Sequence, residues 1–207
     1  MSSFYERNVL PHVIGCACGT RLIGRQRAKI VPRAAGRVLE LGIGGGLNLA
    51  YYDPAKVYSV TGIDPSEVLR VKAGSAPRAV GLKVEVLDGQ AECMPFDAAS
   101  FDTIVCTFTL CSVASPQAAL AEARRVLKPS GRFLFSEHGL APDPDVERWQ
   151  RRIEPVWKRL AGGCHLTRRV AASIAAAGFK IDDFETMYLP RAPRPLGWSE
   201  WGSAHRV

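Results

Sequence analysis

Residues 37–48 read Arg-Val-Leu-Glu-Leu-Gly-Ile-Gly-Gly-Gly-Leu-Asn, and the interpretation of the whole chain begins with them. The apolar run Val38–Leu41 ends abruptly in glycine, and four of the five positions in Gly42–Gly46 are glycine. Glycine permits positive φ angles and lets a ligand approach the backbone closely. The apolar residues of Leu47–Tyr51 then predict the start of a helix, whose free N–H groups face the ligand. We therefore predict a buried strand, a tight turn and a helix that bind a nucleotide-like ligand.

The pattern of strand, turn and helix repeats along the chain. The predicted strands are Val38–Leu41, Val57–Asp64, Lys83–Leu87, Asp102–Phe108, Arg132–Glu137, Phe179–Met187 and Trp198–Val207. Helices are predicted at Ser66–Ala73, with Ser66 as N-cap, at Pro116–Leu127 and at Thr167–Ala177. This alternation predicts an α/β fold with a Rossmann-like, seven-stranded, doubly wound sheet. We expect it to be mostly parallel, with an antiparallel last strand at its edge and ligands beyond the carboxyl ends of its strands.

A chain of 207 residues suits one domain. We expect an N-terminal helical cap over residues 1–33, with two short helices within residues 3–31. A ligand-binding core follows over residues 34–140, a helical insertion or lid and the last helix over residues 141–178, and C-terminal strands over residues 179–207. The insertion carries an apolar stripe at helical spacing, with a kink near Pro155: Val146, Trp149, Ile153, Val156, Trp157 and Leu160. Such stripes are usually core, but one that follows a ligand-facing strand also suits the roof of a substrate pocket.

The composition is that of a globular enzyme, with 47% hydrophobic and 23% charged residues. The net charge of +7 comes without clusters of aromatic and basic residues, so we expect a solvated basic surface and no nucleic-acid partner. Pro11 and His12 interrupt the apolar run Val9–Ile14, so we expect no signal peptide, no integral membrane segment and a cytoplasmic location.

Six cysteines are scattered along the chain without the spacing of a disulfide framework. Reduced thiols in a reducing compartment are the natural interpretation. His12, Cys16 and Cys18 lie close in sequence, but no second ligand pair follows at the spacing of a zinc finger. We therefore expect no metal site.

The residues around the glycine turn narrow the choice of ligand. A dinucleotide fingerprint would need glycine or alanine where Leu47 stands. Glu40 lies two residues before the first glycine and can face an ammonium group, whereas it would repel a pyrophosphate. Asp64 ends the next predicted strand and can accept hydrogen bonds from both hydroxyls of a ribose. These residues favour a nucleoside that carries an amino-acid tail.

Five motifs in this order and spacing resemble the class I S-adenosylmethionine-dependent methyltransferases, of the methyltransferase type 11 kind. They are Val38–Gly46, Gly62–Ser66, Gln90–Phe96, Ser100–Val105 and Arg124–Gly131. The resemblance extends from about Gly36 to Gly139, half of the chain. It implies S-adenosylmethionine as the cofactor and S-adenosylhomocysteine as the product.

The resemblance also implies a role for particular residues. At the methionine part it implies Glu40, Gly42 and Gly44, with Asn48 near the carboxylate. At the adenosine it implies Asp64 on the ribose, Pro65 against the adenine, and Gln90 and Ala91 at the adenine edge. Thr107 and Leu110 would line the sulfonium end. Many relatives have aspartate where Gln90 stands, although a glutamine carbonyl can accept the same hydrogen bond.

The flanking residues resemble the thiol S-methyltransferases of the methyltransferase-like family. The resemblance rests on Phe4-Tyr5, Cys106–Val113, Glu137-His138 and the segment from Trp149 to Arg168. It implies that the acceptor is a thiol of a small, fairly apolar molecule, and His138 and His165 are the candidate bases. The mammalian relatives carry an N-terminal membrane anchor, which we do not expect here, and asparagine where His165 stands. Two alternatives stay open: an N- or O-methyltransferase of a phospholipid or amphipathic metabolite, and a non-catalytic cofactor-binding protein. We expect a monomer or a homodimer.

Overall fold

The computed structural model describes residues 9–11, 15 and 18–207. Within them, the N-terminal cap ends in helix α3, Arg21–Ile30, and the 3-10 turn η1, Val31–Arg33. The Thr20 hydroxyl accepts the backbone N–H of Ile23 at 3.4 Å, so this threonine caps α3. Several residues of the predicted cap helices lie outside the described residues: Phe4, Tyr5, His12, Val13, Ile14 and Cys16.

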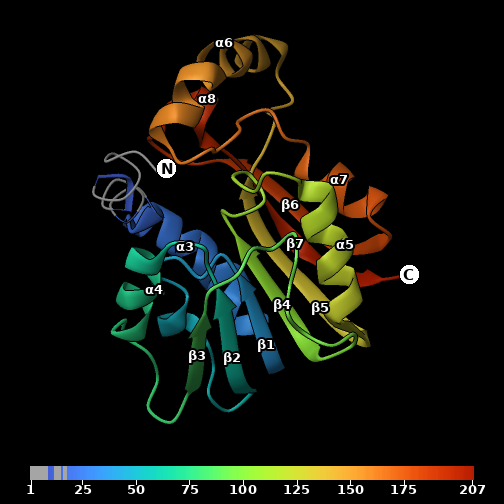
Figure 1. The fold of residues 1–207 in the computed structure, drawn as a ribbon. Helices are drawn as coiled ribbons and strands as arrows, with labels where there is room; N and C mark the ends of the chain where they lie inside the picture. Colours follow the sequence, from blue (N-terminus) through green and yellow to red (C-terminus); the bar gives the residue numbers. More distant parts are fainter. Residues whose placement is uncertain (1–8, 12–14, 16–17) are drawn as a thin grey trace.

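Seven strands of the described chain form one sheet in the order β3-β2-β1-β4-β5-β7-β6 (Figure 1). The strands are β1 Gly36–Leu41, β2 Val57–Ile63, β3 Lys83–Leu87, β4 Phe101–Thr107, β5 Leu127–His138, β6 Phe179–Tyr188 and β7 Trp198–Arg206. Strands β1 to β5 run parallel, whereas β7 pairs antiparallel with both β5 and β6. The predicted seven-stranded, mostly parallel sheet with an antiparallel last strand is therefore confirmed.

The predicted edge position of the last strand is wrong, because β7 lies between β5 and β6. Residues 199–204 of β7 are all buried. At Gly202, a Cβ atom would come within 2.1 Å of the Asp183 backbone oxygen in β6. No side chain therefore fits at Gly202, where the neighbouring strand approaches closely. The edge position is predicted because the last segment of the chain is short, and its length does not reveal which strands lie beside it.

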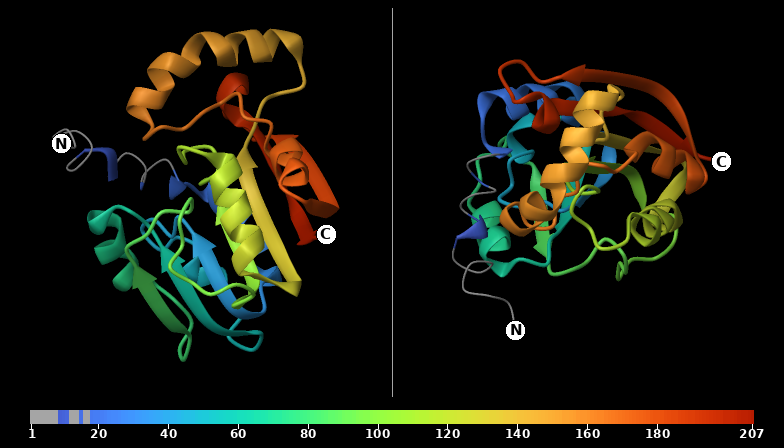
Figure 2. Two further views of the ribbon diagram at one scale, coloured as in Figure 1. Left: turned by 45° about the vertical axis from the view of Figure 1, so that its right-hand side comes forward. Right: turned by 90° about the horizontal axis from the view of Figure 1, so that it is seen from above.

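Helices cover both faces of the sheet (Figures 1 and 2). Besides α3, the helices after it are α4 Glu67–Gly74, α5 Pro116–Val126, α6 Pro144–Leu160, α7 Val170–Ala176 and α8 Arg194–Gly197, of which α6 lies beyond the end of the sheet and not on a face. Successive strand residues alternate between the faces: Ile104 packs in the cluster that contains residues of α5 and α7, and Val105 in the cluster that contains Ile30 of α3. Each face of the sheet therefore has its own buried core.

The helix predicted directly after the glycine turn is absent from the described chain, and the structure has only the 3-10 turn η2, Leu49–Tyr51. Pro54 disfavours helical backbone at Asp53. Tyr52 has an extended backbone, and its side chain enters the core with 3% of its surface exposed. The ligand-facing N–H groups therefore belong to the turn itself and not to the start of an α-helix.

Helix α6 stands beyond the carboxyl ends of the strands, above the rest of the molecule (Figures 1 and 2). The sequence predicts this helix correctly, and Pro155 lies inside it. The expectation that its stripe is core is wrong for Trp149, Val156 and Leu160, which are 56%, 60% and 53% exposed. No helix in the described ranges combines the length and the apolar composition needed to cross a membrane.

Candidate functional site

The turn after β1 is shaped by glycines with positive φ angles: 66° at Gly42, 54° at Gly44 and 77° at Gly46. At Gly42 a Cβ atom would come within 2.4 Å of the Thr109 hydroxyl oxygen. That hydroxyl donates to the carbonyl oxygen of Leu41 at 2.9 Å and so holds the loop after β4 against the turn. The bare backbone at Gly42 is therefore required both by conformation and by space.

Glu40 is buried at the end of β1, with 1% of its surface exposed. Its Oε1 accepts a hydrogen bond from Asn48 Nδ2 at 2.9 Å, and its Oε2 accepts one from the Tyr52 hydroxyl at 2.6 Å. Burial raises the pKa of Glu40 to about 7, although the hydrogen bonds from Tyr52 and Asn48 lower it. A cation at this carboxylate would stabilise its charged form.

Asn48 bridges β1 and β4, because its Nδ2 also donates to Thr107 Oγ1 at 3.0 Å. Its other amide atom, Oδ1, is buried and has no hydrogen-bond partner among the described residues. An unpaired buried acceptor is costly, so this atom calls for a donor from a ligand.

A cavity of about 170 Å³ lies at this end of the sheet. The sequence-predicted residues that line it are Glu40, Gly42, Gly44, Asn48 and Thr107. It is also lined by three residues that the sequence does not predict to bind the cofactor: Arg27, Lys72 and Phe108. The structure thus brings half of the ten predicted cofactor residues to one cavity.

Arg27 enters this cavity from α3 and is 5% exposed. Its Nη1 donates to the Cys18 carbonyl oxygen at 2.7 Å, whereas its Nε is buried without a partner in the part of the chain that the structure describes. Burial lowers the pKa of the Arg27 guanidinium. Two residues that line this cavity therefore each have a buried side-chain atom without a partner among the described residues: a donor, Arg27 Nε, and an acceptor, Asn48 Oδ1. This pair fits a zwitterionic amino-acid group.

Asp64, at the end of β2, is 7% exposed and touches the glycine turn. Its Oδ2 accepts the Gly44 N–H at 3.0 Å, and its Oδ1 accepts the Ser66 N–H at 2.8 Å. Burial raises the pKa of Asp64, against the two backbone hydrogen bonds, which lower it. Each carboxylate oxygen keeps one lone pair that can accept a hydroxyl hydrogen.

The other predicted cofactor residues lie outside the lining of this cavity. Pro65 follows Asp64 on the surface, and Gln90 is exposed at the carboxyl end of β3, beside the buried Ala91. Leu110 is buried, with 2% of its surface exposed. These residues lie after the carboxyl ends of β2, β3 and β4.

The loop after β4 is held by a buried carboxylate, Glu137, for which the sequence predicts no role in the site. Glu137 Oε1 accepts the N–H groups of Thr109 at 2.8 Å and Leu110 at 3.0 Å, and Oε2 accepts that of Cys111 at 3.3 Å. Phe108, just before them, has a positive φ of 53°. Burial raises the pKa of Glu137, and the backbone N–H groups lower it. Glu137 fixes the shape of a loop that borders the cavity at Phe108.

Both predicted bases adjoin this loop. The His138 ring lies 5.3 Å from the Phe108 ring, centre to centre, and burial lowers the pKa of His138. The His165 N–H donates to the Cys111 carbonyl oxygen at 2.8 Å, and its Nδ1 lies 3.2 Å from Glu154 Oε1. Burial, and then the positive charges of Arg168 and Lys158, lower the pKa of His165. Both imidazoles therefore favour the neutral form, which can accept a proton.

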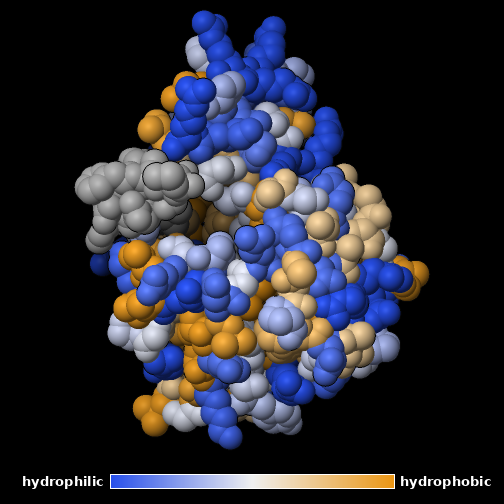
Figure 3. All heavy atoms as spheres, viewed as in Figure 1, coloured by the Kyte–Doolittle hydropathy of each residue, from blue (hydrophilic) through white to orange (hydrophobic). Residues whose placement is uncertain are grey.

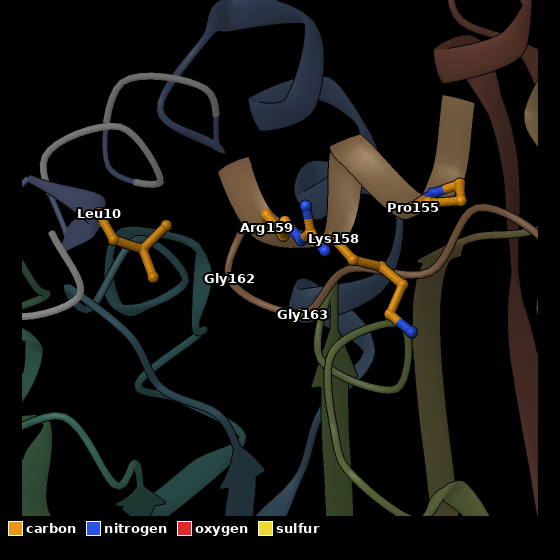
Figure 4. Close-up of a pocket in the computed structure, with 6 residues that line it drawn as sticks. All are labelled: Leu10, Pro155, Lys158, Arg159, Gly162 and Gly163. Carbon is orange, nitrogen blue, oxygen red and sulfur yellow. The ribbon is translucent and has the colours of Figure 1, made fainter. Parts of the chain in front are cut away.

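A larger cavity, of about 720 Å³, lies between α6 and the segment that contains Leu10 (Figure 4). Its other described lining residues are Pro155, Lys158, Arg159, Gly162 and Gly163. The surface is visibly hollowed below α6 (Figure 3). This cavity offers room for a second molecule beside the first site. No cluster of three or more possible metal ligands occurs among the described residues, and Cys18, Cys93, Cys106, Cys111 and Cys164 are free thiols.

Residues 39–135 match a family model described as a methyltransferase domain. The thiol S-methyltransferase TMT1B of Rattus norvegicus is 36% identical over 165 residues, which cover 78% of this chain and 65% of the relative. The Homo sapiens TMT1B is 36% identical over 171 residues, covering 80% and 67%. This chain thus spans about two thirds of the length of these relatives. Among solved structures, an S-adenosylmethionine-dependent methyltransferase of Thermotoga maritima, described as a possible histamine N-methyltransferase, has a TM-score of 0.68 and 22% identity, with 98% of each chain covered.

Proposed function

Because the chain belongs to the class I S-adenosylmethionine-dependent methyltransferases, we propose that it transfers a methyl group from S-adenosylmethionine to the thiol of a small, fairly apolar molecule. The relatives named thiol S-methyltransferases support the choice of acceptor. S-adenosylhomocysteine and an S-methylated thioether are the products. The observation that carries the cofactor part is the pair of unpaired buried atoms, Arg27 Nε and Asn48 Oδ1.

The amino-acid end of the cofactor fits this pair. Its ammonium group would donate to Glu40 and to Asn48 Oδ1, and its carboxylate would accept from Arg27 Nε. Asn48 has already committed its N–H groups to Glu40 and Thr107, so its available atom suits the ammonium better than the carboxylate. Arg27 therefore takes the carboxylate role that the sequence resemblance gives to Asn48.

The remaining predicted residues would hold the adenosine and the sulfonium. The two Asp64 oxygens keep lone pairs for the ribose hydroxyls. Pro65, Gln90 and Ala91 follow along the strand ends where the adenine would lie. Thr107, which lines the smaller cavity, and the buried Leu110 would border the sulfonium.

When bound, the cofactor supplies a methyl group on a positively charged sulfur, with a neutral thioether as the leaving group. The chain then has two tasks, to position the acceptor in line and to take its proton. A free thiol has a pKa of about 8.5, so a neutral imidazole that accepts its proton increases the reactive thiolate. His165 is held by Glu154, and with Nδ1–H directed to Glu154 its Nε2 accepts that proton. His138 is the second candidate base, and its ring packs against that of Phe108, which lines the smaller cavity.

A second candidate, N- or O-methylation of a phospholipid or amphipathic metabolite, is favoured by one observation. Lys158 and Arg159 line the larger cavity, and no ion pair of either side chain occurs among the described residues. Two cations at a cavity suit an anionic head group.

Product analysis separates the two candidates. The purified protein is incubated with S-adenosylmethionine and either a panel of alkyl and aryl thiols or phosphatidylethanolamine vesicles, and the products are identified by mass spectrometry. We expect methyl thioethers with the thiols and unchanged lipid. Methylated lipid with untouched thiols would replace the first candidate by the second. Measured cofactor binding without transfer to either acceptor would indicate a non-catalytic protein.

A further inference from the structure

The solvent-facing side of α6 has apolar residues where a water-exposed helix usually has polar ones. Trp149 is 56% exposed, Val156 60% and Leu160 53%. Residues seven apart on a helix lie only about 20° apart around its axis, so Trp149 and Val156 share one line along α6. Trp157, one position after Val156, belongs to a neighbouring side of the helix and is partly buried.

Arginines flank this line on one side. Arg148, Arg152 and Arg159 are all exposed. The Arg152 guanidinium lies over the Trp149 ring, 5.6 Å from its centre. Arg148 pairs with Asp145, which is itself 83% exposed at the side chain. An apolar line with tryptophan and a border of arginines is the composition of helices that lie in a membrane interface.

The opposite side of α6 is fixed to the body of the protein. Gln150 is 1% exposed. Its Oε1 accepts a hydrogen bond from the Ala141 N–H at 2.9 Å, and its Nε2 donates one to the Gly139 carbonyl oxygen at 3.1 Å. Glu154 accepts the N–H groups of Leu166 at 2.9 Å and Thr167 at 2.8 Å. The helix is therefore held by the side opposite its exposed apolar line, and it lies at the top of the molecule in Figure 1.

Helix α6 also lines the larger cavity, through Pro155, Lys158 and Arg159 (Figure 4). A surface that receives the outer line of α6 would thus lie next to the mouth of that cavity. The charges on and around α6 decide between possible surfaces: five basic residues stand against three acidic ones in the helix, and the whole chain carries +7. The complementary surface is anionic and has an apolar interior.

We propose that α6 docks on the surface of an anionic lipid bilayer. In this arrangement, Trp149 and Val156 insert at the boundary between head groups and acyl chains. Arg148 and Arg152 bind lipid phosphates. The docking does not depend on the acceptor being a thiol. It would let an apolar molecule dissolved in the bilayer enter the cavity directly.

The test measures sedimentation of the full chain with phosphatidylcholine vesicles and with vesicles that also contain phosphatidylglycerol. We expect at least about tenfold tighter binding to the anionic vesicles, and a loss of this preference at high salt. W149S/V156S should weaken anionic-vesicle binding by at least about fivefold. The matched control, Y58S/V80S, removes an exposed aromatic and an exposed valine elsewhere, 75% and 99% exposed, and should bind like the wild type.

The charge part is tested in the same way. R148Q/R152Q should lose the preference for anionic vesicles, whereas R25Q/K83Q, which removes two exposed charges away from α6, should keep it. Equal binding by W149S/V156S and Y58S/V80S overturns the proposal, as does equal affinity for neutral and anionic vesicles. Sedimentation velocity without lipid tests whether this face joins two copies of the chain. A wild-type dimer that the W149S/V156S substitutions dissociate would show such a contact and would also overturn the bilayer proposal.

Discussion

Glu137 Oε1 lies 3.0 Å from the backbone nitrogen of Leu110 and accepts its hydrogen bond in the interior of the protein. The same carboxylate accepts the N–H groups of both neighbouring residues of Leu110. A side chain from the end of β5 therefore fixes the backbone that follows β4.

Replacement of Glu137 by alanine should lower the free energy of unfolding by about 3 kcal/mol, because three amides lose their acceptor and those left buried cost about 1–3 kcal/mol each. Denaturant unfolding at neutral pH measures this loss. E137Q is the matched control, because its amide oxygen still accepts and its shape is nearly the same, so we expect a smaller loss. An E137A protein as stable as the wild type would show that the loop forms without this carboxylate.

Binding of S-adenosylhomocysteine should weaken as the pH falls below 7. The pKa of Glu40 is about 7 in the unliganded protein, and the ligand's ammonium group favours the ionised carboxylate, so binding at lower pH must release a proton. The affinity then falls by up to about tenfold per pH unit below 7 and is flat above it. Calorimetric titration of the wild type and E40Q measures both slopes. E40Q should bind more weakly at pH 8 and lack the slope, and an unchanged slope would assign the proton to another group.

Stability without ligand should change with pH in the opposite sense. The folded-state pKa of Glu40 is raised from 4.5 to about 7, so the folded protein binds the proton more tightly than the unfolded chain. Its contribution to the free energy of unfolding is then full below the unfolded pKa and is lost as the pH rises toward 7. E40Q carries no such group, so its free energy of unfolding should fall less than that of the wild type between pH 5 and 7. The difference in slope corresponds to about one bound proton. Identical pH profiles for the two proteins would contradict this.

Replacement of Arg27 by methionine should weaken S-adenosylhomocysteine binding by about tenfold to a hundredfold, the effect of losing a charge-assisted hydrogen bond. Methylthioadenosine has the adenosine and sulfur but no amino-acid group, so its affinity should stay within about twofold. R25M, on the same helix and exposed, is the control for the substitution itself. Equal losses for both ligands would mean that Arg27 supports the fold of the cavity and not the carboxylate.

Alanine at Gly42 should abolish measurable cofactor binding, whereas alanine at Gly81 should leave it unchanged. Both glycines have positive φ, 66° and 85°, so both variants pay the backbone cost of about 1–2 kcal/mol. Only at Gly42 does the new Cβ meet the Thr109 side chain; at Gly81 no described atom lies within 4 Å. The comparison isolates the close approach from the backbone strain. Retained binding by G42A would show that the loop after β4 can move aside.

Replacement of His165 by glutamine should lower kcat with a thiol acceptor by about a hundredfold near pH 7 and leave the cofactor affinity unchanged. The loss should shrink as the pH rises above the thiol pKa of about 8.5, where the acceptor ionises without help. H205Q is the matched control, because His205 also pairs with a carboxylate, 2.7 Å from Asp182, but lies on the outer strands. H138Q is measured in parallel, and unchanged turnover in both H165Q and H138Q would remove the assigned base.

The sequence predicts those parts of the fold in which burial and periodicity act locally. Strand β3 has the bounds that its pattern predicts, and the stripe of α6 identifies a helix around Pro155. The order of the last strands is not a local property. It depends on how closely β6 and β7 approach at Gly202, which only the assembled sheet reveals.

The candidate site follows the same division. Glu40 and Asp64 stand at predictable strand ends beside glycine, so their position follows from the motif. Arg27 and Glu137 lie outside the glycine motif and reach the site through tertiary contacts. Arg27 extends from α3 to the cavity, and Glu137 binds the backbone of the loop after β4. In the sequence Arg27 is one arginine of a basic, amphipathic helix, and nothing local indicates that its guanidinium is buried.

The position of β7 between β5 and β6 also has a consequence for biosynthesis. In the described sheet, β6 hydrogen-bonds only to β7, yet the ribosome makes β6 first. Until β7 has left the ribosome, β6 has no neighbour in the sheet, and its backbone groups must stay in water or be shielded. The two outermost strands should therefore join the sheet together and late, after the strands that carry the glycine turn have already paired.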